Sequence, residues 1–287
     1  MNKIRYAIIG CGSMGMEHIR NIALIDNAEV TALCDNYKSS VNNSLEILKK
    51  NVPTFKSHIE LMNANIADAY IIATPNFTHF EILKDIIKSE AHILIEKPLC
   101  TTVQDCKEIK NNTINYPGII WVAMEYRYMP PIARFIEEIH KGTIGDLKML
   151  SIREHRFPFL VKVNDWNRFA KNSGGTMVEK CCHFFDLMRF ITKSEALSVF
   201  ASGNQDNNHL NESYDGKIPD IIDNAYAVVD FQNGVRALLD LCMFAENSVL
   251  QEEICGVGNK GKIETGVPSD SSGKNSSELS IGLRDID

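Results

Sequence analysis

The strongest constraint in this sequence is a glycine-rich turn that joins an apolar run to a helical pattern. Residues 4–9 read Ile-Arg-Tyr-Ala-Ile-Ile, and residues 10–15 read Gly-Cys-Gly-Ser-Met-Gly. A Gly-x-Gly-x-x-Gly match alone is weak evidence, because glycines mark any tight turn. Here the turn leaves a predicted strand and opens a predicted helix, and Asp35 follows Gly15 by twenty residues at the end of a second apolar run. This combination predicts a dinucleotide-binding unit.

Each residue type in the turn has a mechanical reason. Gly10 permits a sharp exit from the strand, and Gly12 lets the backbone approach a pyrophosphate with no side chain in the way. Gly15 allows the helix to lie close to the sheet. The first helical residues, Ser13 and Met14, then point unpaired N–H groups and the positive end of the helix dipole at the phosphates.

The acidic residue after the second strand favours one dinucleotide over the other. The Asp35 carboxylate can accept hydrogen bonds from both hydroxyls of the adenosine ribose, and it would repel a 2′-phosphate. We therefore expect NAD rather than NADP. The alternative is a tight structural turn with a solvated aspartate.

The first half of the chain continues this alternation of strands and helices. Further strands are expected at residues 30–34, 52–55, 69–73, 92–95 and 119–123, which predicts a doubly wound parallel sheet of the Rossmann type over residues 1–124. Ligands of such sheets bind beyond the carboxyl ends of the strands, near the point where strand order reverses. Polar breaks follow these ends at residues 10–15, 35, 74–76, 96–98 and 125–127, and we expect them to converge on one cleft.

The second half changes character. Helices are expected at residues 132–140 and 176–190, a strand at 147–154, and hairpins around 232–234 and 258–261, with a polar, flexible loop at 203–219. These elements predict an α+β domain over residues 125–268, with an open, mostly antiparallel sheet covered by helices on one face. The polar composition of residues 269–287 predicts a disordered tail.

Charge and cysteine usage exclude several function classes. Lys and Arg number 30 against 37 Asp and Glu, a net charge of −7 with no basic run, so no nucleic-acid partner is expected. The eight cysteines form no Cys-x-x-Cys pair, and we interpret them as reduced thiols of a cytoplasmic protein. No apolar stretch is long enough to cross a bilayer, and we expect neither a signal peptide nor a membrane partner.

Two residues have the chemistry of proton transfer beside a nicotinamide. Lys97 follows a predicted buried strand at the cofactor end of the sheet, where an amine can bind a substrate hydroxyl; the alternative is a surface lysine paired with Glu96. Glu179 and His183 are four residues apart in a predicted helix, so a carboxylate would orient the imidazole of a general base. A packed or capping histidine is the competing interpretation.

Other candidates near these residues carry weaker signals. Cys181, Cys182 and His183 lack the spacing of zinc ligands, so we predict no metal. Trp166 and Arg168, in a polar turn before Gly174-Gly175, either line the cleft or anchor the surface.

Taken together, the ordered motifs resemble the Gfo/Idh/MocA family of glucose-fructose oxidoreductases, inositol dehydrogenases and rhizopine-catabolism proteins. The resemblance covers nearly the whole chain: the glycine turn at 10–15, Ala73-Thr74-Pro75-Asn76-x-x-His79, Glu96-Lys97-Pro98, Arg127-x-x-Pro130, and Gly174-Gly175 leading to Glu179-x-x-x-His183-x-x-Asp186.

The resemblance implies the roles of individual residues. It makes Lys97 the catalytic lysine, His183 the acid/base histidine, and Glu179 the occupant of a position where the family usually has an aspartate. The predicted cofactor-binding residues are Gly10, Gly12, Ser13, Met14, Gly15, Asp35, Thr74, Pro75, Asn76, His79, Glu96 and Lys97. The predicted substrate-binding residues are Lys97, Arg127, Trp166, Glu179 and His183.

The resemblance also implies an activity: NAD-dependent hydride transfer between a nicotinamide and a secondary alcohol or ketone of a sugar, inositol or related polyol. Family members often assemble through their open sheet, which implies a homo-dimer or homo-tetramer. Lys180-Cys181 replaces the more usual small or apolar residue and glycine, and the chain ends earlier than its family usually does, as a truncated form would. Two alternatives remain: a redox-silent regulatory homologue that binds nucleotide or sugar, and a cofactor-assisted lyase or hydrolase that reoxidises its own NADH.

Overall fold

The structure is a computed structural model that describes residues 3–268 and 278–285. The chain forms two compact units. Unit 1 comprises Met1–Ala123 with Lys171–Gly174, and unit 2 comprises Met124–Ala170 with Gly175–Asp287.

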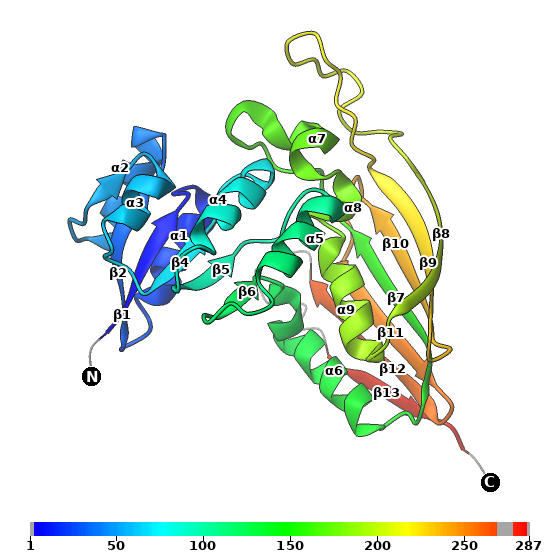
Figure 1. The fold of residues 1–287 in the computed structure, drawn as a ribbon. Coiled ribbons are helices and arrows are strands. Elements are labelled where there is room, and N and C mark those ends of the chain that lie inside the picture. Colours follow the sequence, from blue (N-terminus) through cyan, green and yellow to red (C-terminus); the bar gives the residue numbers. More distant parts are fainter. Residues whose placement is uncertain (1–2, 269–277, 286–287) are drawn as a thin grey trace. The chain divides into compact units, whose positions relative to one another are not determined.

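Unit 1 is built on a six-stranded sheet in which every neighbouring pair is parallel. The strand order is β3-β2-β1-β4-β5-β6, so the order reverses between β1 and β4 (Figure 1). The predicted doubly wound Rossmann sheet is thereby confirmed. Its strands are β1 (Ile4–Ile9), β2 (Ala28–Cys34), β3 (Thr54–Phe55), β4 (Ala69–Ile72), β5 (His92–Ile95) and β6 (Ile120–Val122).

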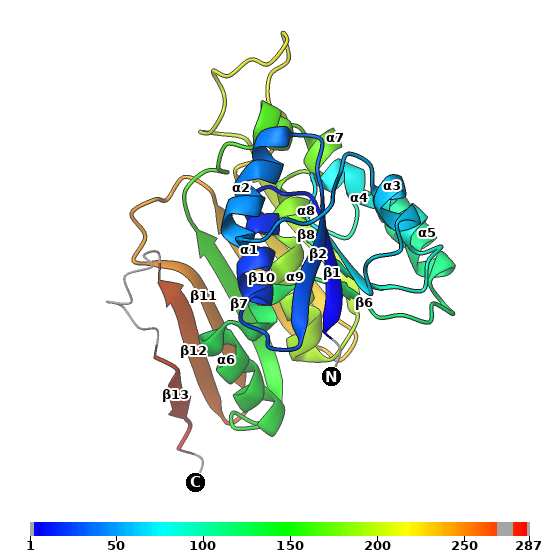
Figure 2. The same ribbon diagram turned by 90° about the vertical axis from the view of Figure 1, so that its left-hand side faces the viewer.

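Helices cover both faces of this sheet (Figure 2). One face packs against α1 (Ser13–Ile22) and α2 (Lys38–Leu48), and the other against α3 (His58–Asn63), α4 (His79–Ile86) and α5 (Val103–Asn112). Successive strand residues point to opposite faces. Ile8 therefore packs with the α1 side while Ala7 and Ile9 pack with the other. A short η1 turn (Asn76–Thr78) precedes α4.

Unit 2 contains a seven-stranded sheet of order β13-β12-β11-β7-β10-β9-β8. Its pairs are antiparallel except β7 with β10, so the predicted mostly antiparallel sheet is confirmed. The predicted hairpins are confirmed as β9 with β10 and β11 with β12. The strands are β7 (Leu147–His155), β8 (Ala196–Asn204), β9 (Asn224–Phe231), β10 (Arg236–Cys242), β11 (Leu250–Gly258), β12 (Gly261–Pro268) and β13 (Ser280–Leu283).

Helices α6 (Pro130–Lys141) and α9 (Cys182–Thr192) lie on one face of the seven-stranded sheet (Figure 1). Phe135 of α6 and Phe184 of α9 are completely buried there, against strand residues such as Leu239. Each such side chain contributes about 2–3 kcal/mol by leaving water. The remaining short elements are η2 (Glu125–Tyr128), η3 (Val163–Arg168), α7 (Ala170–Ser173) and α8 (Thr176–Glu179).

The single helix expected at residues 176–190 is wrong, because the structure divides it into α8 and α9. The N–H groups of Lys180 and Cys181 both donate to the carbonyl of Thr176, at 3.0 and 3.2 Å. Two donors on one carbonyl widen the turn, and the Cys181 carbonyl then accepts from Phe184 at 3.0 Å and starts a new helix. Glu179 and His183 therefore belong to different helices, and their i,i+4 spacing does not place them on one helical face.

The disordered tail expected at residues 269–287 is also wrong in part. Residues 269–277 and 286–287 lie outside the described residues. Ser280–Leu283, however, forms β13 and pairs antiparallel with β12. The composition of the tail did not indicate this strand, because its side chains stay exposed. The strand forms through backbone hydrogen bonds to the existing sheet edge at β12.

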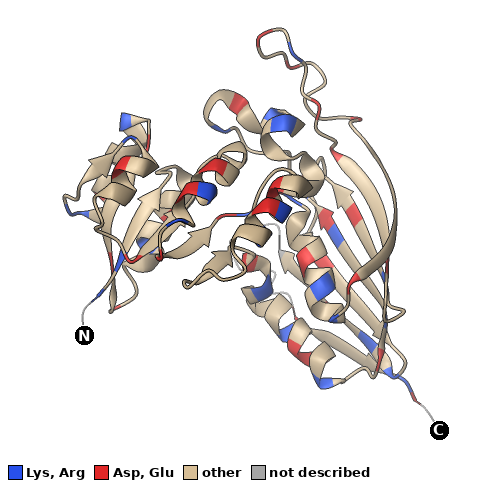
Figure 3. Cartoon of the chain, viewed as in Figure 1, with Lys and Arg blue, Asp and Glu red and all other residues tan. Residues whose placement is uncertain are grey.

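Charged side chains of both signs are interspersed along the described part of each unit (Figure 3). Over the described residues, the helices lack the combination of length and hydropathy that crossing a bilayer requires.

One cluster of buried charges in unit 2 joins Glu154, Glu252 and Lys180. Glu154 of β7 and Glu252 of β11 stand directly opposite each other in the sheet and are 0% and 3% exposed. The ammonium of Lys180 lies 2.9 Å from Glu154 Oε1 and 3.9 Å from Glu252 Oε1. Like charges directly opposite each other are destabilising, and the lysine relieves this repulsion. Burial, together with the charge of Glu154, raises the pKa of the Glu252 carboxyl to about 7.

This raised pKa predicts how stability responds to pH in the Glu252→Gln variant. The unfolded carboxyl loses its proton near 4.5 and the folded one near 7, so the wild-type protein loses stability as pH rises through this window. Glutamine does not titrate. The variant should therefore gain about 1–3 kcal/mol in free energy of unfolding, relative to wild type, between pH 5 and 8. Urea denaturation across pH measures this difference.

The exposed Glu264→Gln substitution on β12 serves as the matched control, since its carboxylate is solvated and pairs with Lys262 at the surface. A pH-independent difference between Glu252→Gln and wild type would contradict the assignment of the buried proton.

Candidate functional site

The candidate site of unit 1 lies at the carboxyl edge of its sheet, where β1 and β4 meet at the reversal of strand order. Gly10 follows β1 with a φ of +95°, and a Cβ there would lie 2.4 Å from the Ala73 carbonyl oxygen. A Cβ at Gly15 would lie 2.0 Å from the Gly10 carbonyl oxygen. Both positions require glycine, Gly15 because α1 lies close to the backbone of Gly10, and Gly10 because the segment after β4 passes close to it.

The third glycine of the turn is required for a different reason. A Cβ at Gly12 would meet nothing within 4 Å, and the backbone there has an ordinary φ of −75°. Gly12, Ser13 and Met14 are exposed, and α1 begins at Ser13. The first N–H groups of a helix have no partner within it, so this exposed end presents donors and a positive dipole to an anion. The open space suits a pyrophosphate.

Asp35 stands at the end of β2, next to this turn. Its Oδ2 accepts from the Cys11 N–H at 2.7 Å, and its Oδ1 accepts from the Tyr37 N–H at 2.8 Å. The carboxylate is thus oriented by the glycine turn itself. Each oxygen keeps further acceptor capacity for ribose hydroxyls.

His79 is buried beneath this edge of the sheet. Its ring is completely buried, with Nδ1 2.7 Å from the Pro98 carbonyl and Nε2 2.9 Å from the Thr74 carbonyl. Burial lowers the pKa of His79, while the two carbonyl contacts oppose that shift. Its assignment to cofactor binding stays a prediction. His79 ties the loop after β4 to the loop after β5.

Neighbouring predicted residues hold the same edge together. Asn76 is buried and donates to the Ser173 carbonyl at 3.1 Å. Thr74 accepts a hydrogen bond from the Thr78 hydroxyl at 2.7 Å, and Pro75 caps η1. Glu96 is buried and bonds His18 of α1 at 2.7 Å, which connects the loop of Lys97 to the phosphate-facing helix.

Lys97 is the second residue after β5, between buried Glu96 and buried Pro98, and is itself partly exposed. Four of the five predicted segments, at residues 10–15, 35, 74–76 and 96–98, thus follow strands of one parallel sheet at one edge. The fifth, at residues 125–127, belongs to unit 2.

His183 is the centre of the candidate site in unit 2. It lies in the first turn of α9 and is 2% exposed. Its ring stacks on the ring of Tyr126, with centroids 4.0 Å apart and planes 6° from parallel. Its Nε2 lies 3.5 Å from Oε1 of Glu125, whose carboxylate is half-exposed. A buried imidazole beside a carboxylate has the arrangement of a general base.

Arg127 holds η2 against α9. Its Nε donates to Asp186 Oδ2 at 2.6 Å and its Nη2 donates to Asp186 Oδ1, while the guanidinium lies 4.4 Å from the centroid of the Phe190 ring. The Asp186 carboxylate raises the pKa of Arg127. This bidentate pair fixes Glu125 and Tyr126 beside His183, and substrate contact by Arg127 stays a prediction.

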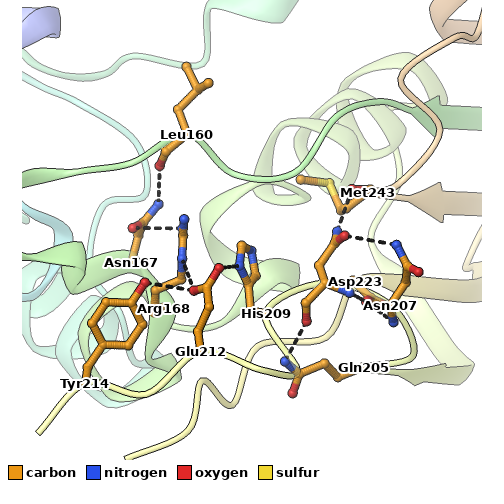
Figure 4. A network of polar contacts seen from close by, with 11 residues as sticks. Leu160, Asn167, Arg168, Gln205, Asn207, His209, Glu212, Tyr214, Asp223 and Met243 are labelled. Carbon is orange, nitrogen blue, oxygen red and sulfur yellow. Dashed lines mark hydrogen bonds and ion pairs between the residues drawn. The ribbon is translucent and has the colours of Figure 1, made fainter.

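The segment that carries Trp166 is anchored by a polar network (Figure 4). Buried Arg168 donates to Glu212 at 3.2 Å, and Glu212 also contacts His209 and Tyr214, each at 2.8 Å. Burial opposes ionisation of Glu212, but the bonds from His209 and Tyr214 lower its pKa overall. Arg168 therefore ties η3 to the polar loop predicted at residues 203–219.

The other end of this loop is held by Asp223, whose carboxylate accepts from the N–H groups of Asp206, Asn207 and Asn208 at 2.6–3.2 Å (Figure 4). These backbone donors outweigh the effect of burial and lower the pKa of Asp223. Trp166 lies partly buried in η3, and its contact with a substrate stays a prediction.

The sequence interpretation missed two residues of the unit 2 site. Glu125 and Tyr126 contact His183, whereas only their segment was singled out, as the break after the last strand of the Rossmann sheet. Glu179, the residue predicted to orient His183, is buried at the end of α8, and that role stays a prediction. Within residues 3–268 and 278–285, no three His, Cys, Asp or Glu side chains gather as metal ligands.

The two kinds of glycine predict separable mutant effects. Gly12→Ala places a methyl group in open space and should cost at most about 1 kcal/mol of stability, since glycine is preferred to alanine at an N-cap. That methyl group obstructs the pyrophosphate, so NADH binding should weaken at least about 10-fold. Gly15→Ala forces backbone atoms apart and should cost about 3 kcal/mol. Fluorescence titration with NADH and urea denaturation distinguish the two; wild-type NADH affinity in folded Gly12→Ala would count against the phosphate site.

Comparison with known proteins identifies the same two parts. A family model described as "Oxidoreductase family, NAD-binding Rossmann fold" matches residues 4–124, and its companion, "Oxidoreductase family, C-terminal alpha/beta domain", matches residues 136–283. The WlbA dehydrogenase from Bordetella pertussis, solved with NADH and UDP-GlcNAcA, is 20% identical with a TM-score of 0.78, over 94% of this chain and 80% of that one. At this identity the likeness concerns the fold.

Two curated relatives are similar in sequence. Myo-inositol 2-dehydrogenase of Thermotoga maritima is 27% identical over 260 residues, which is 91% of this chain and 74% of the relative. The rhizopine catabolism protein MocA of Rhizobium meliloti is 26% identical over 201 residues, or 68% of this chain and 59% of the relative. This chain therefore spans less than two thirds of the length of MocA. Because the two family models together match most of the sequence, the chain belongs to the Gfo/Idh/MocA oxidoreductase family.

Proposed function

We propose that this protein is an NAD-dependent dehydrogenase that acts on a secondary alcohol, or the corresponding ketone, of an inositol, a sugar or a related polyol. The observation that carries the proposal is the edge of unit 1 where the open glycine turn, Asp35 and Lys97 follow β1, β2 and β5 of one sheet. The inositol dehydrogenase among its relatives supports the substrate class.

The residues of this edge suit NAD. Gly12 leaves room for the pyrophosphate, α1 offers it N–H donors, and Asp35 offers acceptors to the ribose while disfavouring a 2′-phosphate. When bound, NAD supplies the acceptor of the hydride. Side chains of the protein bind and orient the substrate and accept its hydroxyl proton.

Lys97 and His183 divide the remaining work in this proposal. Lys97 binds the substrate hydroxyl and stabilises negative charge on its oxygen, and His183 accepts the hydroxyl proton as the carbon is oxidised. The half-exposed Glu125, 3.5 Å from His183 Nε2, stabilises the imidazolium that forms. Glu179 orients His183 and, with Trp166 and Arg127, contacts the substrate. The proposal requires Lys97 and His183 to act on the same carbinol.

The proposal is tested by absorbance at the NADH band, with NAD and with NADP, across a panel of inositols, sugars and other polyols. We expect turnover of at least one panel member with NAD, and a lower kcat/KM with NADP because of Asp35. A protein that binds NADH but turns over no member favours a redox-silent regulatory function. Product formation without a net absorbance change favours a lyase or hydrolase that reoxidises its own NADH.

On the substrate found in that panel, Lys97→Ala should lower kcat by roughly 100-fold or more, the scale of a lost acid/base group. Its NADH affinity should stay near wild type, because the phosphate and ribose contacts come from other residues. Lys88→Ala, which removes an exposed lysine paired with Asp85 on the same unit, is the matched control. Wild-type turnover in Lys97→Ala would reject the role of this lysine.

The open sheet of unit 2 supports a further part of the proposal, a homo-dimer or homo-tetramer. Phe200, Val228 and Leu238 stand side by side across β8, β9 and β10, and they are 74%, 38% and 36% exposed. A continuous exposed apolar row on a sheet is typical of an interface between copies of a chain.

A cytoplasmic location stays a prediction.

Phe200→Asp combined with Val228→Asp should convert the assembly to monomers, because each interface would bury four added charges. Light scattering after size exclusion measures the mass. Leu24→Asp, at an 83% exposed apolar residue of unit 1, should leave the mass unchanged. A wild-type monomer at micromolar concentration would overturn the assembly, with no bearing on the dehydrogenase proposal.

A further inference from the structure

Lys180 is the one member of the buried charge group that belongs neither to the sheet nor to a helix. It occupies the junction between α8 and α9, where the chain turns just before His183, and it is 4% exposed. Its ammonium pairs with Glu154, which is completely buried, at 2.9 Å. Burying a lysine is costly unless its charge is paired and its protons are hydrogen-bonded. The ammonium also contacts a residue that packs against His183.

That contact is the phenol of Tyr126. Lys180 Nζ donates to Tyr126 Oη and lies 4.8 Å from the centroid of the Tyr126 ring. The phenol also hydrogen-bonds Glu252. The Tyr126 ring is thus anchored at its oxygen by two members of the charge group, and its face stacks on His183 at 4.0 Å. Lys180, Tyr126 and His183 form one contiguous series of contacts.

The chemistry of Tyr126 decides what this series can do. Burial, with the nearby charges of Glu252 and Glu154, raises the pKa of the phenol far above its usual range. The phenol therefore stays neutral at every working pH and does not pass a proton to His183. The series acts through position: it fixes the plane on which the imidazole lies. The hydrogen bonds between Arg127 and Asp186 hold the same η2 segment.

We propose that Lys180 is a positioning residue for His183, which it orients by anchoring the Tyr126 ring against the imidazole. The proposal rests on the acid/base role of His183 in the proposed function. A general base displaced by about 1 Å loses roughly 100-fold in rate, so an anchor beneath the imidazole affects turnover without touching the substrate. It also accounts for a lysine at position 180, because a small or apolar side chain there could not hold the phenol.

The test compares Lys180→Met, Tyr126→Phe and the double variant. Each single change removes one end of the same hydrogen bond, and Phe keeps the ring that stacks on His183. We expect each to lower kcat by roughly 10- to 100-fold, with KM and NADH affinity within about twofold of wild type. Because both act through one contact, the double variant should lose no more than the worse single variant.

A signal that needs no turnover is the NMR chemical shift of the His183 ring protons, which the face of Tyr126 displaces upfield. In Lys180→Met the hydrogen bond to Tyr126 is lost, so the chemical shift of the His183 ring protons should move downfield, toward that of an imidazole with no stacked ring. The matched control is Tyr116→Phe in unit 1, which removes a phenol bonded to the Ala91 carbonyl and should change neither kcat nor the His183 shift.

Lys180→Met leaves two buried carboxylates without their cation. If it does not fold, the same comparison is made in a Glu252→Gln background. Lys180→Met combined with Glu252→Gln removes one positive and one negative charge from the cluster. Folded variants that keep both wild-type kcat and the wild-type His183 shift would overturn the positioning role. If the wild-type protein turns over no substrate, the proposed function fails, while the His183 shift still tests whether Lys180 holds the stack.

Discussion

The close approach of α1 to the sheet of unit 1 is the constraint on which the nucleotide site depends. A side chain at Gly15 would collide with the Gly10 carbonyl, and one at Gly10 would collide with the Ala73 carbonyl after β4. Because neither position carries a side chain, α1 starts directly after β1, at the reversal of strand order. Its unpaired N–H groups face the space beyond β1. The other residues of this edge stabilise that arrangement: Asp35 through the Cys11 N–H, and Glu96 through His18 of α1.

Unit 2 positions its site by a different means, through contacts between side chains. His183 depends on Tyr126, Tyr126 depends on Lys180, and Lys180 depends on two carboxylates that face each other across β7 and β11. Such a network is costly, because buried like charges oppose folding and apolar side chains would pack there without that cost. A network of this kind is better explained by the geometry it imposes on His183 than by stability.

This contrast explains what could be predicted from the sequence. The glycine turn, the parallel strands and both hairpins depend on local backbone geometry and on periodicity, and they were predicted correctly. The two carbonyl partners of His79 could not be predicted, because only the fold brings them to its ring. The division between α8 and α9 was missed because the helical pattern runs through it, and the buried partners of Lys180 come from distant strands.

The same reasoning separates what backbone geometry fixes from what side-chain contacts fix in this chain. Backbone geometry at the glycine turn tolerates few residue types, so a dinucleotide site can be recognised from a single sequence. A network such as Lys180, Tyr126 and Glu252 can change in composition while still presenting an imidazole in one orientation. Lys180, Tyr126 and Glu252 therefore act on turnover through the orientation of His183, and not through a proton transfer of their own.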